Sequence, residues 1–199
     1  MDIGVIDYGA SNLFGVAEAL RREGASVSTI KGRFLPSRFD LLVLPGVGSF
    51  PYAVDGLQDV KESIIEFRSN GGIIFGICLG LHLFFVSSEE GNGKGLAFLD
   101  GKVRRITGSV KVPHMGWSNT KLSQPTELWD GMHEEEWFYY AHSYFADPPT
   151  DTVKARVDYG INMAAVVVEK NVIGVQFHPE KSATAGKKLL RNLLMMVRR

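Results

Sequence analysis

The sequence contains a single cysteine, Cys78, among its 199 residues. An intrachain disulfide, a Cys-x-x-Cys redox pair and a zinc site built from several thiolates are therefore excluded. The chain also lacks an excess of either charge, because it has 22 Lys and Arg residues and 22 Asp and Glu residues. This balance gives no electrostatic reason to expect a nucleic acid or an anionic membrane as a partner.

Targeting segments and long apolar runs are also missing. The start of the chain, residues 1–4, has neither the basic nor the apolar region of a secretory signal peptide. Residues 70–88 have no charged side chain, but four glycines, Cys78 and His82 interrupt them, as expected for a buried strand followed by a buried helix. Without a signal peptide, we expect a cytosolic protein. The 45% of hydrophobic residues can fill one core, and no linker divides the chain, so we expect one domain over residues 1–199.

The segment Gly76-Ile77-Cys78-Leu79-Gly80 follows the apolar run 73–75 and precedes a helix-compatible stretch. This order predicts a strand, a sharp turn that presents a thiol, and a helix, as in the nucleophile elbow of hydrolases. Glycines allow such a turn without Cβ collisions, and N–H groups at the helix start favour a thiolate. A lone cysteine can also be a small buried side chain, so a partner base must decide.

His178 and Glu180, directly after the last expected strand, supply such a base. Residues two apart on an extended backbone share a face, so we expect Glu180 to bond one ring nitrogen of His178 while the other faces Cys78. That is the arrangement of a catalytic triad. A strand-end histidine with a solvated neighbour is the alternative interpretation.

The turn Pro45-Gly46-Val47-Gly48 ends the expected strand 41–44 and would lie at the same sheet edge as Cys78. Its glycines let backbone N–H groups approach a ligand, although a plain loop is the alternative. The residues together predict acyl transfer through a thioester, in which His178 takes the proton of Cys78. The expected oxyanion donors are the backbone N–H groups near Val47, Gly48 and Leu79.

The rest of the pattern predicts an α/β fold. Strands and helices alternate in the first half, which is typical of a parallel sheet with helices on both faces, and short strands then predict a largely antiparallel region. The expected strands are 2–8, 25–30, 41–44, 73–75, 102–106, 117–122, 137–145, 153–159, 163–169 and 172–177. The expected helices contain Leu13 to Leu20, Leu57 to Phe67, Leu81 to Phe85 and Leu189 to Val197.

These motifs, in this order, resemble those of the class I, Cys-His-Glu glutamine amidotransferases. Three further stretches are similar to the glutaminase subunits of imidazole glycerol phosphate synthase, which acts in histidine biosynthesis: 7–13, 113–117, and the aromatic run before 142–144. The resemblance extends from residue 2 to about 198. It implies a flavodoxin-like class I glutamine amidotransferase fold, a mixed, mostly parallel sheet flanked by helices with added antiparallel strands.

The resemblance also implies an activity and a partner. Glutamine would be hydrolysed to glutamate and ammonia, and the ammonia would pass, shielded from bulk water, to a (βα)8-barrel cyclase subunit in a heterodimer. The five scattered histidines show no metal-ligand spacing, and we expect no cofactor. The corresponding residues are Cys78, His178 and Glu180 for the triad, Val47, Gly48 and Leu79 for the oxyanion, His82, Glu90, Ser143 and Tyr144 for the substrate, and Asn12, Trp117, Tyr139 and Lys181 for the partner.

Three positions depart from the family pattern. His82 replaces a Gln that lines the glutamine pocket, and an imidazole has a different shape and can titrate, so glutamine affinity is the property we expect to differ. Ser11 replaces a usual Gly and Ser118 a usual Asn, which predicts local differences in partner contacts. Trp117 and Tyr139 can also be interpreted as core aromatics, and Lys181 as a solvated charge.

Two alternatives to this function stay open: a glutaminase that feeds a different synthase, and a non-catalytic flavodoxin-like binding module. The family resemblance further implies low activity alone and stimulation when the partner binds its nucleotide ligand. In that hypothesis, the turn 45–48 reorients before Val47 donates to the oxyanion.

Overall fold

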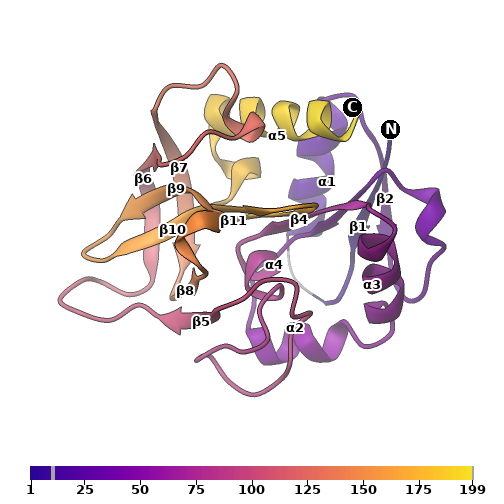
Figure 1. Ribbon diagram of the computed structural model, residues 1–199, viewed down its shortest axis with the longest axis horizontal. Coiled ribbons are helices and arrows are strands. Elements are labelled where there is room, and N and C mark those ends of the chain that lie inside the picture. The colour runs from indigo at the N-terminus through magenta and orange to yellow at the C-terminus, as the bar shows by residue number, and fades with distance from the viewer. Residues whose placement is uncertain (10–11, 199) are drawn as a thin grey trace.

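The computed structural model describes residues 1–9 and 12–198. Its centre is a nine-stranded sheet in the order β2-β1-β3-β4-β11-β10-β9-β6-β7, with helices on both faces (Figure 1). Ala10 and Ser11, which belong to the motif 7–13, and Arg199 lie outside the described residues. The Ser11 departure therefore remains a sequence observation.

Five strands form the parallel half of the sheet: β1 (Asp2–Ile6), β2 (Ser26–Ile30), β3 (Leu41–Leu44), β4 (Ile73–Ile77) and β11 (Val172–Val175). Helices cover both faces of the central strands, so side chains on both sides of a strand are buried. All four residues of β3 are 0% exposed. This double burial explains why the sequence has continuous apolar runs there instead of an alternating pattern.

Four strands continue the same sheet in antiparallel pairing: β10 (Asn162–Glu169), β9 (Val153–Asp158), β6 (His114–Leu122) and β7 (Glu135–His142). A separate antiparallel pair is formed by β5 (Lys102–Arg105) and β8 (Tyr144–Asp147). The predicted mixed α/β fold with added antiparallel strands is confirmed. One sheet includes strands from both halves of the chain.

The helices divide between the two faces of the sheet (Figure 1). On one face lie α1 (Leu13–Arg22) and α5 (Ala183–Val197), and on the other α2 (Phe50–Gly56), α3 (Lys61–Ser69) and α4 (Leu79–His82). Because successive strand residues point to opposite faces, each face has its own apolar core. Leu42 joins the core beneath α2, α3 and α4, whereas Val43 joins the core beneath α1 and α5.

The helix expected over Leu57 to Phe67 begins later than predicted, because residues 57–60 form a turn between two helices. α2 ends at Gly56 and α3 begins at Lys61. Between them the backbone turns, and the N–H of Val60 donates to the carbonyl of Leu57 at 3.0 Å. Both side chains are nonetheless 1% exposed, so the turn preserves an apolar spacing that resembles one continuous helix.

The single strand expected over 137–145 is also wrong. β7 ends at His142 and pairs with β6 in the large sheet, whereas β8 begins at Tyr144 and pairs with β5. Ser143 lies at the corner where the chain leaves one sheet for the other, and its carbonyl accepts from the N–H of Ile106 at 2.9 Å. The aromatic run continues through this corner, so composition gave no indication of the break.

Glycines on both sides of Cys78 allow three backbone segments to touch. A Cβ atom on Gly80 would lie 1.8 Å from the carbonyl oxygen of Leu44, at the end of β3. A Cβ atom on Gly76 would lie 2.6 Å from the carbonyl carbon of Gly80. Real Cβ atoms do not approach backbone this closely, so only glycine permits β3, β4 and the start of α4 to meet. The turn 45–48, which follows β3, is thereby held next to Cys78.

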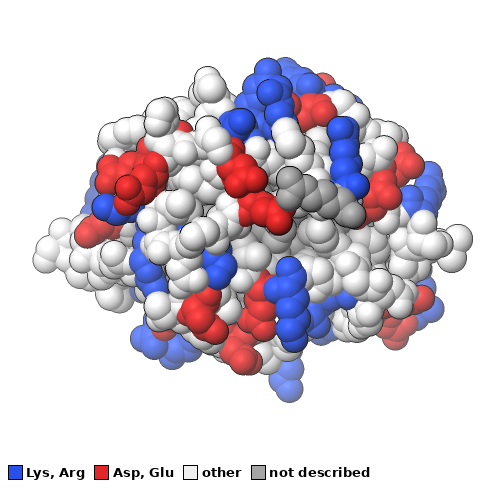
Figure 2. All heavy atoms as spheres, turned by 45° about the horizontal axis from the view of Figure 1, so that its top comes forward, with Lys and Arg blue, Asp and Glu red and all other residues white. Residues whose placement is uncertain are grey.

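The surface is consistent with the balanced charge of the sequence. On the face drawn in Figure 2, acidic and basic side chains occur together among uncharged ones. Among the described residues, none of the helices has the length and apolar character that crossing a membrane requires. The uncharged run 70–88 divides into β4, the elbow and α4, as the sequence predicted.

We predict that Gly80→Ala destabilises the protein by more than about 3 kcal/mol, because the new methyl group meets the backbone of Leu44. Gly24→Ala is the control: its Cβ meets nothing within 4 Å, and its φ of 86° alone costs about 1 kcal/mol. Urea unfolding followed by circular dichroism measures both. Equal losses in the two variants would show that the Leu44 contact does not constrain the elbow.

Candidate active site

Cys78 lies at the tip of a strained turn between β4 and α4. Its φ of 51° and ψ of −101° are unusual for any residue with a side chain. Its N–H donates to the carbonyl of Val175 on β11 at 2.8 Å, which fixes the turn against the sheet. The predicted strand-to-helix elbow is therefore present, although α4 has only four residues and its dipole contributes less to a thiolate than a long helix would.

His178 and Glu180 form a buried pair beside the elbow. Nδ1 of His178 lies 2.9 Å from Oε1 of Glu180, and the two side chains are 1% and 2% exposed. The predicted contact exists, but for a different reason than the one we gave. Glu180 lies on a 3-10 turn, η4 (Pro179–Lys181), and not on an extended strand, so the turn brings its carboxylate back to the ring.

The interactions of His178 keep its ring protonated. Burial alone would lower the pKa of His178, but hydrogen bonding and charge interactions with Cys78 and Glu180 outweigh burial and raise the pKa to about 10. Nε2 has no partner with ordinary hydrogen-bond geometry. The His178 ring therefore interacts with the sulfur of Cys78 through charge and not through an aligned hydrogen bond. An imidazolium beside the sulfur favours the nucleophilic thiolate.

Asn12 contacts the carboxylate of Glu180, although the sequence analysis assigned it to a partner interface. Its Nδ2 donates to Oε1 of Glu180 at 2.6 Å. Asn12 precedes α1 and has a left-handed φ of 73°, a conformation that Asn tolerates better than most residues. Oε1 of Glu180 thus receives two hydrogen bonds, while the buried Oε2 has none. The start of α1 is thereby linked to the His178–Glu180 pair.

A cavity of about 260 Å³ opens over the sulfur of Cys78. The structure brings eight of the predicted site residues together around it: Val47, Gly48, Cys78, Leu79, His82, Glu90, Ser143 and Tyr144. Pro113, Met115, Ala141 and His142 complete the lining. A larger, more open groove of about 500 Å³ lies beside β2, but no cysteine, histidine or carboxylate is among the described residues that line it, so we locate the chemistry at the smaller cavity.

Two side chains anchor the ends of the turn 45–48. The hydroxyl of buried Tyr8 donates to the carbonyl of Pro45. Oε2 of Glu90 accepts from the N–H of Phe50, the first residue of α2, at 2.8 Å. Burial raises the pKa of Glu90, and the N–H of Phe50 partly offsets that rise. Between the anchors, Gly48 has a φ of 142°, which favours glycine.

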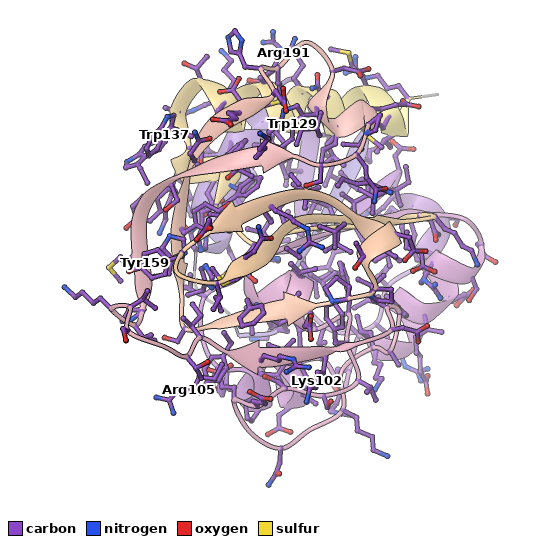
Figure 3. All side chains as sticks on the ribbon, turned by 60° about the vertical axis from the view of Figure 1, so that its left-hand side comes forward. Lys102, Arg105, Trp129, Trp137, Tyr159 and Arg191 are labelled. Atoms are coloured by element: carbon purple, nitrogen blue, oxygen red, sulfur yellow. The ribbon has the colours of Figure 1, made fainter. Side chains whose placement is uncertain are left out.

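The predicted partner residues Trp117, Tyr139 and Lys181 form one cluster on β6, β7 and η4. The rings of Trp117 and Tyr139 meet edge-on with centroids 6.2 Å apart, and Nζ of Lys181 lies 5.8 Å from the Tyr139 ring. Trp117 is 49% exposed, so its interpretation as a core aromatic is wrong. Trp137, which the sequence analysis did not assign, also projects outward and is 57% exposed (Figure 3).

Gln176 was not among the predicted site residues. Its side chain is fully buried, and its Nε2 lies 3.7 Å from the sulfur of Cys78. One observation could have found it: Gln176 lies two residues before His178 in the predicted strand 172–177, although the structure ends that strand at Val175 and bends at 176–177. Tyr8 was missed because its contact with Pro45 depends on the packing of β1 beside β3. Among residues 1–9 and 12–198, no three His, Cys, Asp or Glu side chains converge as a metal site requires.

Comparison with known proteins identifies the family. The model of the family described as glutamine amidotransferase class-I matches residues 4–197. The chain belongs to this family. It is 41% identical over 197 residues to the imidazole glycerol phosphate synthase subunit HisH of Methanothermobacter thermautotrophicus, covering 98% of this chain and 99% of that protein. It is 39% identical over 193 residues to the HisH subunit of Bacillus cereus, covering 96% and 92%.

Solved structures support the amidotransferase fold. PurLQS of Thermotoga maritima superposes with a TM-score of 0.79 at 20% identity, covering 98% of both chains. A glutamine amidotransferase of the same organism superposes with a TM-score of 0.73 at 17% identity, covering 99% of this chain and 97% of that one. Identities this low show the fold alone. Within the amidotransferase family, the chain is most informatively compared with the HisH subunits, to which it is about 40% identical.

We predict that nuclear magnetic resonance titration of His178 gives a midpoint near 10, raised from the ordinary value of 6.5. Cys78→Ser and Glu180→Gln each lower this midpoint by more than about one unit, because each removes a negative partner. Glu89→Gln, which removes a carboxylate that instead pairs with Lys102 on the surface, is the control and leaves the His178 midpoint unchanged.

The raised pKa of His178 also determines how the stability of the fold depends on pH. Because the pKa of His178 is higher in the folded protein, its pairing stabilises the fold fully below about pH 6.5. The stabilisation is lost as the pH rises through about 10. An unshifted midpoint in the unmutated protein would contradict the charged triad.

Proposed function

We infer that this protein is the glutaminase subunit of an imidazole glycerol phosphate synthase in histidine biosynthesis. The observation that supports it most directly is the buried His178–Glu180 pair beside a strained Cys78, at the base of a cavity lined by the predicted substrate residues. The identity of about 40% with HisH subunits over nearly the whole chain selects this amidotransferase among others. We further propose that residues 1–199 form one domain and act in the cytosol.

The reaction proceeds through a thioester. The proton of Cys78 resides on His178, and the thiolate attacks the side-chain carboxamide carbon of glutamine. The N–H groups of Leu79, Val47 and Gly48 stabilise the resulting oxyanion. His178 then protonates the departing nitrogen, which leaves as ammonia and yields a glutamyl thioester. Water, deprotonated by His178, attacks the thioester and releases glutamate and the thiolate.

Charge at the cavity rim orients the substrate. Glu90 faces the cavity and accepts hydrogen bonds from the α-ammonium group of glutamine. Ser143 and Tyr144, at the corner between β7 and β8, bind the α-carboxylate end of the substrate. His82 lies deeper in the cavity, where burial lowers its pKa to about 4 and keeps it neutral. A neutral imidazole adds no charge that would repel the substrate ammonium group.

We predict that Glu90→Gln raises the KM for glutamine about ten-fold, since a neutral amide loses the attraction for an ammonium group worth about 1.4 kcal/mol. The glutamine side chain retains an oxygen for the N–H of Phe50, so the fold and kcat are preserved. Glu89→Gln is the matched control, because Glu89 instead contacts Arg105 and Lys102 on the surface. Equal KM values for both variants would rule out Glu90 as the ammonium site.

The partner that we propose is a (βα)8-barrel cyclase subunit, in a heterodimer that passes ammonia between the active sites. The HisH relatives are named as subunits, which implies a partner of some kind. Asn12, Trp117, Tyr139 and Lys181 are the proposed contacts. The cluster of Trp117, Tyr139 and Lys181 contacts the triad through the backbone, because the carbonyl of Tyr139 accepts from the N–H of His178 at 2.8 Å.

The same contacts suggest how the partner would control activity. A partner that displaces Asn12 would remove one of the two hydrogen bonds to Oε1 of Glu180 and so change the support of His178. The turn 45–48 is anchored at both ends by Tyr8 and Glu90, so reorienting Val47 requires motion only within the turn. We propose that this reorientation accompanies binding of the nucleotide ligand by the partner.

We predict strong glutamate release only in the complete mixture of this chain, the barrel subunit and its nucleotide ligand. Cys78→Ala abolishes this release, because no other thiol in the chain can replace it. Equally strong turnover without the barrel subunit would leave a glutaminase but contradict the gating. No turnover in any mixture, together with no labelling of Cys78 by a glutamine-like electrophile, would favour the non-catalytic binding module. Co-purification with a different synthase would favour the other alternative.

A further inference from the structure

Two buried polar side chains, Gln176 and His82, form a hydrogen-bonded chain that starts at the sulfur of Cys78. Nε2 of Gln176 lies 3.7 Å from Sγ of Cys78, and Oε1 of the same amide lies 3.0 Å from Nε2 of His82. The side chains of Gln176 and His82 belong to residues that are 0% and 4% exposed. Buried polar groups normally have hydrogen-bond partners, so each atom of this chain can be assigned as a donor or an acceptor.

The orientation of the Gln176 amide follows from a backbone donor. The N–H of Ala146 on β8 points to Oε1 of Gln176 at 3.4 Å, and a backbone N–H can only donate. The atom that faces Ala146 and His82 is therefore the amide oxygen. The amide nitrogen, which has two hydrogens, consequently faces the sulfur.

The tautomer of His82 follows from the same oxygen. An amide oxygen only accepts, so Nε2 of His82 must hold the hydrogen in that contact. Burial lowers the pKa of His82 to about 4, and the ring has one N–H at neutral pH. His82 therefore uses its single N–H to hold the amide of Gln176 in place.

Apart from His178, the groups around the sulfur of Cys78 do not stabilise a negative charge on it, so an N–H donor from Gln176 would add to that stabilisation. Besides His82, the titratable groups near Cys78 are Tyr8 after β1, Glu90 across the cavity, His142 on β7, and His178 with Glu180 after β11. Burial raises the pKa of Tyr8 and lowers the pKa of His142, so both are uncharged. The carbonyl of Ala141 lies 3.9 Å from Sγ and can accept from a thiol, but it repels a thiolate.

We propose that Gln176 is a catalytic residue that donates an N–H hydrogen bond to the Cys78 thiolate, and that His82 is the positioning residue that orients this amide. The inference rests on the proposed function, because it takes Sγ as the nucleophile. It assigns to His82 a role behind the sulfur in addition to its place in the cavity lining. The donor stabilises the thiolate before it attacks glutamine and again when it is released from the thioester.

The test measures the rate at which iodoacetamide alkylates Cys78 between pH 5 and 9, by intact mass. With one cysteine, a single adduct reports a single site. In Gln176→Met the midpoint of the pH profile rises by about one unit, and the rate at pH 7 falls about ten-fold. The plateau at high pH is unchanged, because the intrinsic nucleophile is the same. Gln58→Met, in the exposed turn between α2 and α3, is the matched control and keeps the profile.

Two further variants distinguish the positioning role of His82 from the donor role of Gln176. His82→Leu shifts the midpoint in the same direction as Gln176→Met, since the amide loses its orienting donor. His82→Gln restores an N–H donor and brings the midpoint back toward that of the unmutated protein. The double variant of Gln176→Met and His82→Leu shifts no further than Gln176→Met alone, because His82 acts through Gln176.

Two outcomes overturn the proposal. One is an unchanged midpoint in both Gln176→Met and His82→Leu, with each folded by circular dichroism; if Gln176→Met does not fold, His82→Leu and His82→Gln decide. The other is additive shifts in the double variant. Alkylation needs neither glutamine nor a partner, so a shifted midpoint in a protein that lacks glutaminase activity would reject only the proposed function.

Discussion

The backbone of Gly80 lies against the carbonyl of Leu44, and the position of every reactive group in the cavity depends on that contact. It holds the end of β3 beside the end of β4, so the turn 45–48 and Cys78 meet at the same sheet edge. The neighbouring strand β11 receives the N–H of Cys78 and continues toward His178. Nucleophile, base and predicted oxyanion donors thus come from three adjacent parallel strands, whose carboxyl ends form the usual ligand edge of an α/β sheet.

Burial separates the titratable groups of the site into charged and neutral members. Burial is the main influence on His82, His114 and His142, and it lowers their pKa values. His178 is buried as well, but its acidic neighbours Cys78 and Glu180 reverse the effect of burial. One imidazole of the four is therefore charged at neutral pH, and it is the one beside the nucleophile. A positive charge confined to one ring makes His178 the histidine that exchanges protons with the reacting groups.

The sequence predicted the parts of the site that depend on local patterns and failed where distant segments decide. The elbow at Cys78 and the parallel strands followed from glycine placement and continuous apolar runs. The contact of His178 with Glu180 was predicted from strand geometry, although a 3-10 turn produces it. The break at Ser143 depends on the pairing of β8 with β5, which no local pattern in the aromatic run reveals. The contact of Asn12 with Glu180 joins residues 168 positions apart and lay outside any spacing argument.

The solitary thiol has a consequence for the durability of this protein. When a reactive cysteine is oxidised to a sulfenic acid, a nearby thiol can capture it as a disulfide that reductants later reverse. This chain has no second cysteine, so a sulfenic acid at Cys78 could be rescued only by a thiol from outside. The 5% exposure of Cys78 and the small cavity above it restrict access by both the oxidant and the rescuing thiol. Burial of the nucleophile therefore acts as its antioxidant protection, and it also slows repair once that protection fails.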